Sequence, residues 1–197
     1  MIKNKQQYRY YLEKDKEARG INSSLVSRKF KQIIYEDPTW KFQKSLRKVE
    51  FYYNKKKNIV EHIYYYWLEY RFKKLSIRLG FSIPKNAFGP GLSIPHYGSI
   101  IVNSKAKIGK NCKIHCGVNI GASGGNPEAP KIGDNVYLGP GSKIYGNIVI
   151  GNNIAVAANA CVSNSFTEEN ILIGGIPAKK IKNIDISQII KHLKIEN

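Results

Sequence analysis

Four histidines are the side chains best suited to acid–base chemistry near neutral pH: His62, His96, His115 and His192. An imidazole with a pKa near ~6.5 is mostly neutral at pH 7, so it can remove a proton from a hydroxyl group. His96 and His115 fall in the middle of the chain, whereas His62 and His192 fall in outer segments where we expect surface positions. A catalytic zinc needs three protein ligands, and no third histidine lies near the central pair, so we predict no metal site.

The element that must position this pair is a repeat with a period of six residues. Aliphatic residues recur at Val102, Ile108, Ile114, Ile120, Ile132, Leu138, Ile144, Ile150, Val156 and Val162. Neither the helical period of 3.6 nor the alternation of a half-buried strand produces this spacing. It is typical of a parallel β-helix built from short strands and corners. His96 stands six residues before Val102, where the repeat would otherwise place an aliphatic side chain.

The sequence divides into three parts. We expect an α-helical subdomain at residues 1–80, a parallel β-helix at 81–182 and a helical tail at 183–197. Capping residues, breaks and apolar spacing predict helices at residues 5–18, 22–35, 39–53, 60–79 and 186–195. Residues 122–131 lack the aliphatic residue that the repeat requires, so we expect them to form a protruding loop.

The net charge is +18, and residues 1–80 carry 20 Lys and Arg against 8 Asp and Glu. A basic helical part can meet anionic lipid or another polyanion, or it can simply be a solvated surface. Residues 64–67 are Tyr-Tyr-Tyr-Trp and are followed by basic residues, a combination compatible with peripheral membrane association. The alternative is a helix packed on the β-helix or on another subunit, because these aromatic residues do not form one stripe. We predict no nucleic-acid partner.

Three cysteines, Cys112, Cys116 and Cys161, show no paired spacing. Cys112 falls on an inward position of the repeat, so we interpret it as a core thiol. The chain has no apolar run long enough for a membrane span and no signal peptide at its start. These features predict a cytoplasmic protein, which the basic helices could hold at the inner face of the membrane.

The repeat and the segment Pro95-His96-Tyr97-Gly98-Ser99 followed by Ile-Ile-Val resemble the hexapeptide-repeat acyltransferases, in particular the serine acetyltransferase branch. The resemblance implies a left-handed β-helix with three hexapeptides per coil, a homotrimer, and His96 as the general base. Such a base would take the proton of an acceptor hydroxyl while its oxygen attacks the thioester of acetyl-CoA directly. Oxyanion stabilisation would then come from N–H donors of a corner or of the Gly-rich loop.

The same resemblance assigns binding of the acetyl-CoA co-substrate to corner residues and to two lysines. They are Ala122, Ser123, Pro140, Ala158, Lys179 and Lys180. The small residues would lie along the pantetheine arm. The lysines would meet phosphate groups as point charges, although solvated surface lysines are the alternative.

The acceptor side departs from that branch. There an Asp that holds the amino acid precedes the base, and here the residue is Pro95. A loop His that helps to hold serine is replaced by Ala129, and the upstream Asp that orients the base has Ser82 as its nearest counterpart. Glu128 is a candidate substitute for binding an ammonium group, and His115 is a candidate for orienting the base or binding the acceptor. Either residue could instead be an ordinary surface or corner side chain.

The chain also looks like acetyltransferases encoded with bacterial surface-polysaccharide pathways, through residues 40–43, 80–84, 86–92 and 114–116. By this likeness we expect an acetyl-CoA-dependent O-acetyltransferase that acts on a sugar hydroxyl of a capsule or O-antigen. The alternative is a serine O-acetyltransferase of cysteine biosynthesis. A non-catalytic scaffold or binder of anionic surfaces is a third possibility, which the charge favours.

Overall fold

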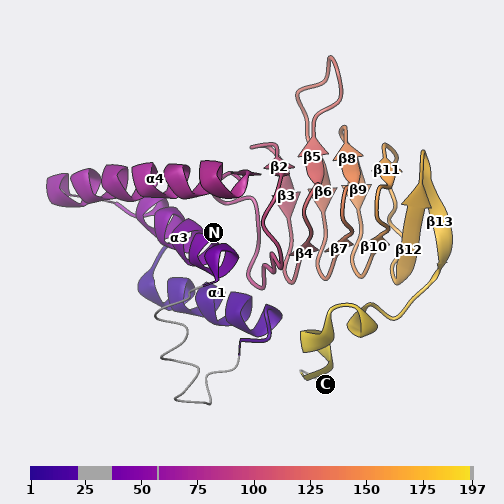
Figure 1. The fold of residues 1–197 in the computed structure, drawn as a ribbon, viewed down its shortest axis with the longest axis horizontal. Helices are drawn as coiled ribbons and strands as arrows, with labels where there is room; N and C mark the ends of the chain where they lie inside the picture. Colours follow the sequence, from indigo (N-terminus) through magenta and orange to yellow (C-terminus); the bar gives the residue numbers. More distant parts are fainter. Residues whose placement is uncertain (22–36, 57, 196–197) are drawn as a thin grey trace.

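A computed structural model describes residues 1–21, 37–56 and 58–195. Three helices lead into a stack of short strands, and a tail of two short 3₁₀ helices follows (Figure 1). The helices are α1 (Lys5–Ala18), α3 (Pro38–Asn54) and α4 (Ile59–Leu79). The helix expected at residues 22–35 lies outside the described residues.

The predicted helix ends are set by capping groups. Asp37 accepts hydrogen bonds from the backbone of Thr39 and Trp40 at the start of α3, and Pro38 occupies its first turn. Asn58 and Glu61 form a capping box at the start of α4. At the other end Gly80 has φ +76°, a left-handed conformation that glycine adopts without strain. The sequence expectations for α1, α3 and α4 are therefore confirmed to within a residue.

The strands form the three faces of a parallel β-helix, as the six-residue period predicts, and the helix is left-handed, as the family resemblance implies. Sheet A contains β1 (Phe81–Ser82), β2 (Ile100–Val102), β5 (Asn119–Gly121), β8 (Lys143–Tyr145) and β11 (Cys161–Val162). Sheet B contains β3 (Lys107–Ile108), β6 (Lys131–Ile132) and β9 (Val149–Ile150). Sheet C contains β4 (Lys113–Ile114), β7 (Tyr137–Leu138), β10 (Ala155–Val156), β12 (Ile171–Gly175) and β13 (Ala178–Asn183).

The repeat works because each coil places its aliphatic residues directly over those of the coil before. In sheet A, Val102 pairs with Ile120 and Ile120 with Ile144, and all three side chains are buried. Adjacent strands lie roughly 4.8 Å apart, so these side chains stack into a continuous apolar column. The chain between β5 and β6 leaves this stack and protrudes from the prism, as expected, except that Lys131 of the expected loop is already in β6 (Figure 1).

A buried ion cluster joins the helices to the first coil. The Arg47 side chain is 0% exposed, and its guanidinium donates to both oxygens of Asp15 (2.7 and 3.2 Å) and to Glu50 (3.0 Å). It also donates to the carbonyls of Phe88 (3.0 Å) and Gly89 (2.6 Å). Burial alone would lower the pKa of Arg47, but the charges of Asp15 and Glu50 raise it. The cluster therefore ties α1 and α3 to the start of the β-helix.

A ladder of asparagines supports the corner between sheets B and C. Asn111, Asn135 and Asn153 all have φ between +56° and +57°. The amide of Asn111 donates to that of Asn135 (2.9 Å), and Asn135 donates to Asn153 (2.9 Å). Asn153 then donates to the Glu169 carboxylate (3.2 Å). Asparagine adopts the left-handed backbone conformation more readily than most residues do, and here its side-chain amide is also hydrogen-bonded. Both properties favour asparagine at these corners.

Replacing Asn135 by alanine should lower the free energy of unfolding by about 1–3 kcal/mol, because alanine strains the left-handed backbone and breaks both amide hydrogen bonds. Urea denaturation followed by circular dichroism measures the change. Asn135→Gly removes the same hydrogen bonds but accepts the backbone conformation, so it should cost less. Equal losses for the two variants would contradict a conformational role for this asparagine.

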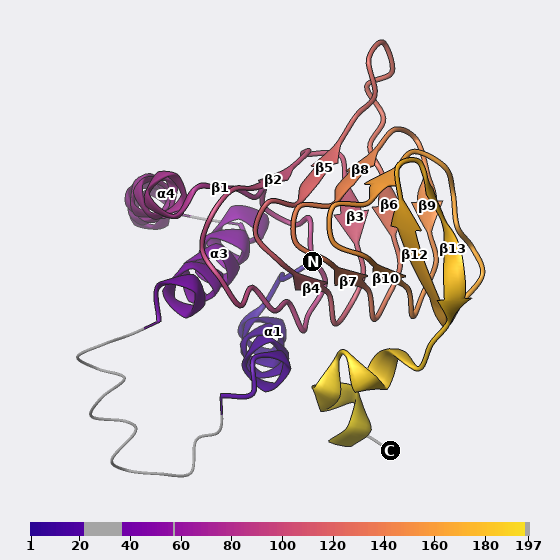
Figure 2. The ribbon, with the colours of Figure 1, turned by 45° about the vertical axis from the view of Figure 1, so that its right-hand side comes forward.

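The end of the chain differs from the expectation of one terminal helix over residues 186–195. Two short 3₁₀ helices, η1 (Ile186–Gln188) and η2 (Lys191–Ile195), occupy that segment. Asp185 caps η1 by accepting from the backbone of Ser187. Ile186 and Ile190 pack on Ala155 of sheet C, and Tyr137 lies against the same cluster. Figure 2 shows the tail folding back beneath sheet C, where its apolar side chains pack against that sheet.

Candidate active site

The predicted base His96 lies in a corner that is two residues longer than those stacked on it. Ser93 pairs with Lys113, and Ile101 pairs with Asn119. The first corner therefore spans 8 positions (101 − 93), whereas the corner of the next coil spans 6 (119 − 113). The extra length leaves the His96 side chain exposed at the junction of sheets C and A. An exposed imidazole is thus presented on a rigid scaffold.

Helical residues hold the segment just before this corner. The Gln43 side chain donates to the Leu92 carbonyl (2.6 Å) and accepts from the Ile94 N–H (3.2 Å). The Arg19 guanidinium donates to the Ile94 carbonyl and to Asp37 (2.7 Å). Burial lowers the pKa of Arg19, while the charge of Asp37 opposes that shift. The backbone two residues before His96 is therefore fixed from outside the β-helix.

The segment after His96 is held by the end of α4. The Gly98 N–H donates to the Leu79 carbonyl (3.0 Å), and the Ile100 N–H donates to the Gly80 carbonyl (3.1 Å). Gly98 has φ +126°, which a residue with a side chain rarely adopts, and a Cβ there would lie 3.2 Å from Cys116 Cβ. The longer corner is thus anchored on both sides, and we infer that this limits the movement of the imidazole.

His115 lies one coil beyond His96, and the two ring centroids are 5.9 Å apart. The His115 ring also packs edge-to-face with the Tyr137 ring, and the two ring centroids are 5.2 Å apart. The Nε2 atom of His115 is buried and has no hydrogen-bond partner among the described residues. Burial lowers the pKa of His115, and the positive charges of Lys113 and His96 lower it further. The ring therefore stays neutral below the pH at which a free imidazole takes up a proton.

This shift predicts a pH dependence of stability. Because the unfolded chain binds a proton on His115 more readily than the folded chain does, its contribution to stability is present above about pH 6.5 and is lost as the pH falls below that value. The free energy of unfolding should therefore fall between pH 7 and the lowered pKa. His115→Gln should show a shallower fall in urea titrations across that range. Identical profiles for the two proteins would contradict the assignment.

Two of the predicted co-substrate residues lie in one line with His96. Two positions after the paired residues Ile114, Leu138 and Val156 come Cys116, Pro140 and Ala158. His96 occupies the matching corner of the preceding coil. Pro140 and Ala158 are exposed, so this corner column presents small side chains over three strand spacings from His96, roughly 14 Å.

The two predicted lysines lie at the far end of this column. In β13, Lys179 pairs with Gly174 and Lys180 with Ile173. The Lys180 ammonium is 2.5 Å from the Glu168 carboxylate, and both groups are exposed. Lys179 is exposed and has no ion pair with a described residue. Lys179 is therefore the more available of the two for a phosphate group.

The remaining predicted residues lie elsewhere in a single chain. Ala122 and Ser123 follow β5, at the opposite end of sheet A from the corner column. Glu128 is in the protruding loop and forms an exposed ion pair with Lys105 (3.0 Å). Ser82 pairs with Ile101 and is exposed, and no hydrogen bond joins it to either imidazole. The roles of these four residues in the site stay predictions.

Sequence reasoning missed the positioning residues. Arg19 and Ile94 are 75 positions apart, and Gln43 and Leu92 are 49 apart, so no local pattern could link them. Tyr137 was not singled out from the sequence, and its contact with His115 follows from the stacking of one coil on the next. In the described part of the chain, no group of three or more His, Cys, Asp or Glu side chains is arranged to bind a metal ion.

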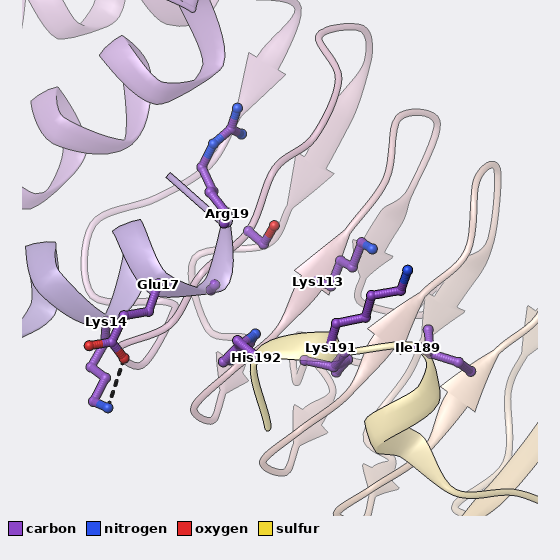
Figure 3. Close-up of a pocket in the computed structure, with 11 residues that line it drawn as sticks. Lys14, Glu17, Arg19, Lys113, Ile189, Lys191 and His192 are labelled. Carbon is purple, nitrogen blue, oxygen red and sulfur yellow. Dashed lines mark hydrogen bonds and ion pairs between the residues drawn. The ribbon is translucent and has the colours of Figure 1, made fainter. Parts of the chain in front are cut away.

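A separate cavity of about 590 Å³ lies between the end of α1, Ser93 and the C-terminal tail. Lys113 and Lys191 extend along its wall, with His192 and Ile189 from the tail beside them (Figure 3). His96 does not line this cavity. This cavity is therefore separate from the exposed His96 side chain.

Comparison with known proteins agrees with this architecture. Residues 129–164 match the family model of the bacterial transferase hexapeptide (six repeats). A solved serine acetyltransferase of Brucella abortus strain S19 superposes with a TM-score of 0.70 at 25% identity, covering 92% of this chain and 71% of that one. The chain shares the fold of serine acetyltransferases. The structure of the same enzyme in complex with coenzyme A matches at 22% identity and a TM-score of 0.65, which bears on the fold alone.

Sequence relatives carry the same name. The serine acetyltransferase of Staphylococcus xylosus is 35% identical over 101 residues, which are 50% of this chain and 46% of that protein. The serine acetyltransferase of Staphylococcus epidermidis is 36% identical over the same length. The chain spans about half the length of the curated relatives it matches.

These relatives overturn the expected acceptor. The prediction of a sugar hydroxyl in capsule or O-antigen biosynthesis is wrong, because the matching proteins are serine acetyltransferases and none points to polysaccharide. That prediction relied on Pro95 and Ala129 in place of residues that hold serine. Loss of one carboxylate beside the base does not identify a sugar, since other groups can bind an ammonium. The alternative interpretation is the better supported one.

Proposed function

We propose that this protein is a serine O-acetyltransferase that uses acetyl-CoA. The observation that carries the proposal is the likeness to serine acetyltransferases across the β-helix, together with the exposed His96 in its longer corner. No described helix is long and apolar enough to cross a membrane. Location in the cytoplasm, at the inner face of a membrane, remains a prediction.

In the proposed reaction His96 removes the proton of the serine hydroxyl as its oxygen attacks the acetyl carbonyl of the thioester. A C–O bond forms, the C–S bond breaks, and the thiolate of CoA leaves and recovers the proton from the His96 imidazolium. No acyl-enzyme is required. His115, held neutral by its surroundings, can accept or donate one hydrogen bond without adding a charge beside the reacting groups.

We further propose a homotrimer as the active form. The corner column with Pro140 and Ala158 and the segment with Ala122 and Ser123 lie at opposite ends of sheet A. A neighbouring prism could supply the second set to a co-substrate bound along the first. Lys179, at the far end of the column, would then meet a phosphate of CoA, and Glu128 of an exposed loop would bind the ammonium of serine.

The test is release of CoA from acetyl-CoA by the purified protein, followed with a thiol reagent, together with mass spectrometry of the acetylated product. L-serine should stimulate release and become O-acetylated. L-alanine, which lacks only the hydroxyl, is the matched control and should not stimulate release. If serine gives no release above the rate without an acceptor, the proposed function is wrong.

A further inference from the structure

Helix α4 has two apolar faces, and only one of them is covered. Tyr65, Leu68 and Phe72 are buried against the rest of the molecule. A second set recurs at helical spacings on the other side and is 58% to 80% exposed: Ile59, Ile63, Tyr66, Tyr70 and Ile77. We call this second set the outer stripe. Figure 1 shows that α4 extends beyond α3, away from the β-helix, so the described chain leaves the outer stripe uncovered.

A basic groove of about 590 Å³ runs along the flank of the same helix, between α3 and α4. Its charged lining consists of six cations: Lys41, Lys44, Lys48, Arg71, Lys74 and Arg78. No carboxylate of a described residue lines it. The acidic residues Glu61 and Glu69 of α4 form ion pairs with Lys55 and Lys85 instead. Tyr64 and Trp67 are among its other lining residues. The Cζ atom of Arg71 lies 4.7 Å from the centroid of the Trp67 ring.

Charge complementarity selects the occupant of this surface. A second copy that met this surface with its own α4 would bring the same six cations, and like charges brought together at an interface are unfavourable. A nucleic acid would neutralise the basic groove but would leave the aliphatic side chains of the outer stripe in water. A bilayer with anionic headgroups can do both, because its acyl region can bury the outer stripe and its phosphates can neutralise the cations of the groove.

We propose that α4 docks on an anionic membrane surface, with the outer stripe inserted at the interface and the basic groove contacting headgroup phosphates. The helix lies along the surface and does not span the bilayer. The aromatic rings of Tyr66 and Tyr70 sit at headgroup level, where amphipathic rings are favoured. This inference is independent of the acetyl transfer proposed above.

The experiment is co-sedimentation with vesicles of phosphatidylcholine alone and of phosphatidylcholine mixed with phosphatidylglycerol. The protein should bind the mixed vesicles, bind the neutral ones far less, and release with added salt. The groove variant Arg71→Gln/Lys74→Gln/Arg78→Gln should lose binding on the order of a hundredfold. The matched control Lys110→Gln/Lys131→Gln/Lys182→Gln removes the same charge from exposed sites on the β-helix and should lose much less.

A stripe variant, Ile59→Ser/Ile63→Ser/Ile77→Ser, should also lose binding to the mixed vesicles while keeping its circular dichroism spectrum. Three outcomes would overturn the proposal. They are no binding to the mixed vesicles, equal losses for the groove variant and its charge-matched control, and a stripe variant that only changes the oligomeric state in size-exclusion chromatography. Binding of a labelled RNA in place of vesicles would likewise assign the basic groove to another partner.

Discussion

Replacing His96 by alanine is expected to lower the rate of acetyl transfer from acetyl-CoA to serine by ~10²–10⁴-fold, the usual contribution of a general base. The His96 side chain is exposed and its ring lies beside that of His115, so the fold should tolerate its loss. A base acts on the chemical step, and kcat should therefore fall more than the KM for either substrate changes.

Two variants control this experiment. His62→Ala removes an exposed imidazole of α4, far from the corner in sequence, and should leave the rate of transfer unchanged. His115→Ala removes the neighbouring ring, and unchanged turnover in that variant would exclude a role for His115 in orienting the base. Turnover of folded His96→Ala protein at the rate of the unmodified chain would remove the basis of the proposed mechanism.

Replacing Arg47 by methionine is expected to lower the free energy of unfolding by about 3–5 kcal/mol. The substitution leaves the carboxylates of Asp15 and Glu50 buried without the cation that both contact. It also leaves the carbonyls of Phe88 and Gly89 without a donor. Urea denaturation measures the loss, and lysine should not restore stability because one ammonium cannot reproduce five N–H donors in a fixed plane.

The exposed Arg9 of α1 provides the matched control, and Arg9→Met should change stability by no more than about 0.5 kcal/mol. In an Asp15→Asn/Glu50→Gln background, Arg47→Met should cost much less than it does alone, because no unpaired anion is left buried. A loss for Arg47→Met as small as that for Arg9→Met would mean that the buried cluster contributes little to stability.

The six-residue period was enough to predict the β-helix, because every inward position must be filled by an aliphatic or small side chain in each coil. The ends of α1, α3 and α4 were also predictable, since Asp37, Asn58 and Gly80 cap their own helices locally. The terminal segment was not, because its conformation depends on packing of Ile186 and Ile190 on the outer face of sheet C.

The site was predictable only in part. His96 could be selected because it stands where the repeat would place an aliphatic residue and because its segment resembles that of serine acetyltransferases, and its role as a base stays a prediction. The hydrogen bonds of Gln43 and Arg19 to the segment before His96 join residues far apart in the chain, so no local sequence pattern could predict them. The acceptor was predicted wrongly, since a substrate is defined by groups gathered from several loops rather than by one substitution beside the base.

The last strand has a consequence for solubility. β13 turns back and runs antiparallel to β12, so the terminal edge of sheet C no longer offers the parallel register of the other coils. That edge also carries Lys179, Lys180 and Lys182, all exposed. A stacked prism invites further strands to add at its open end and grow into a fibre. Reversed direction and a row of positive charge together discourage such end-to-end growth.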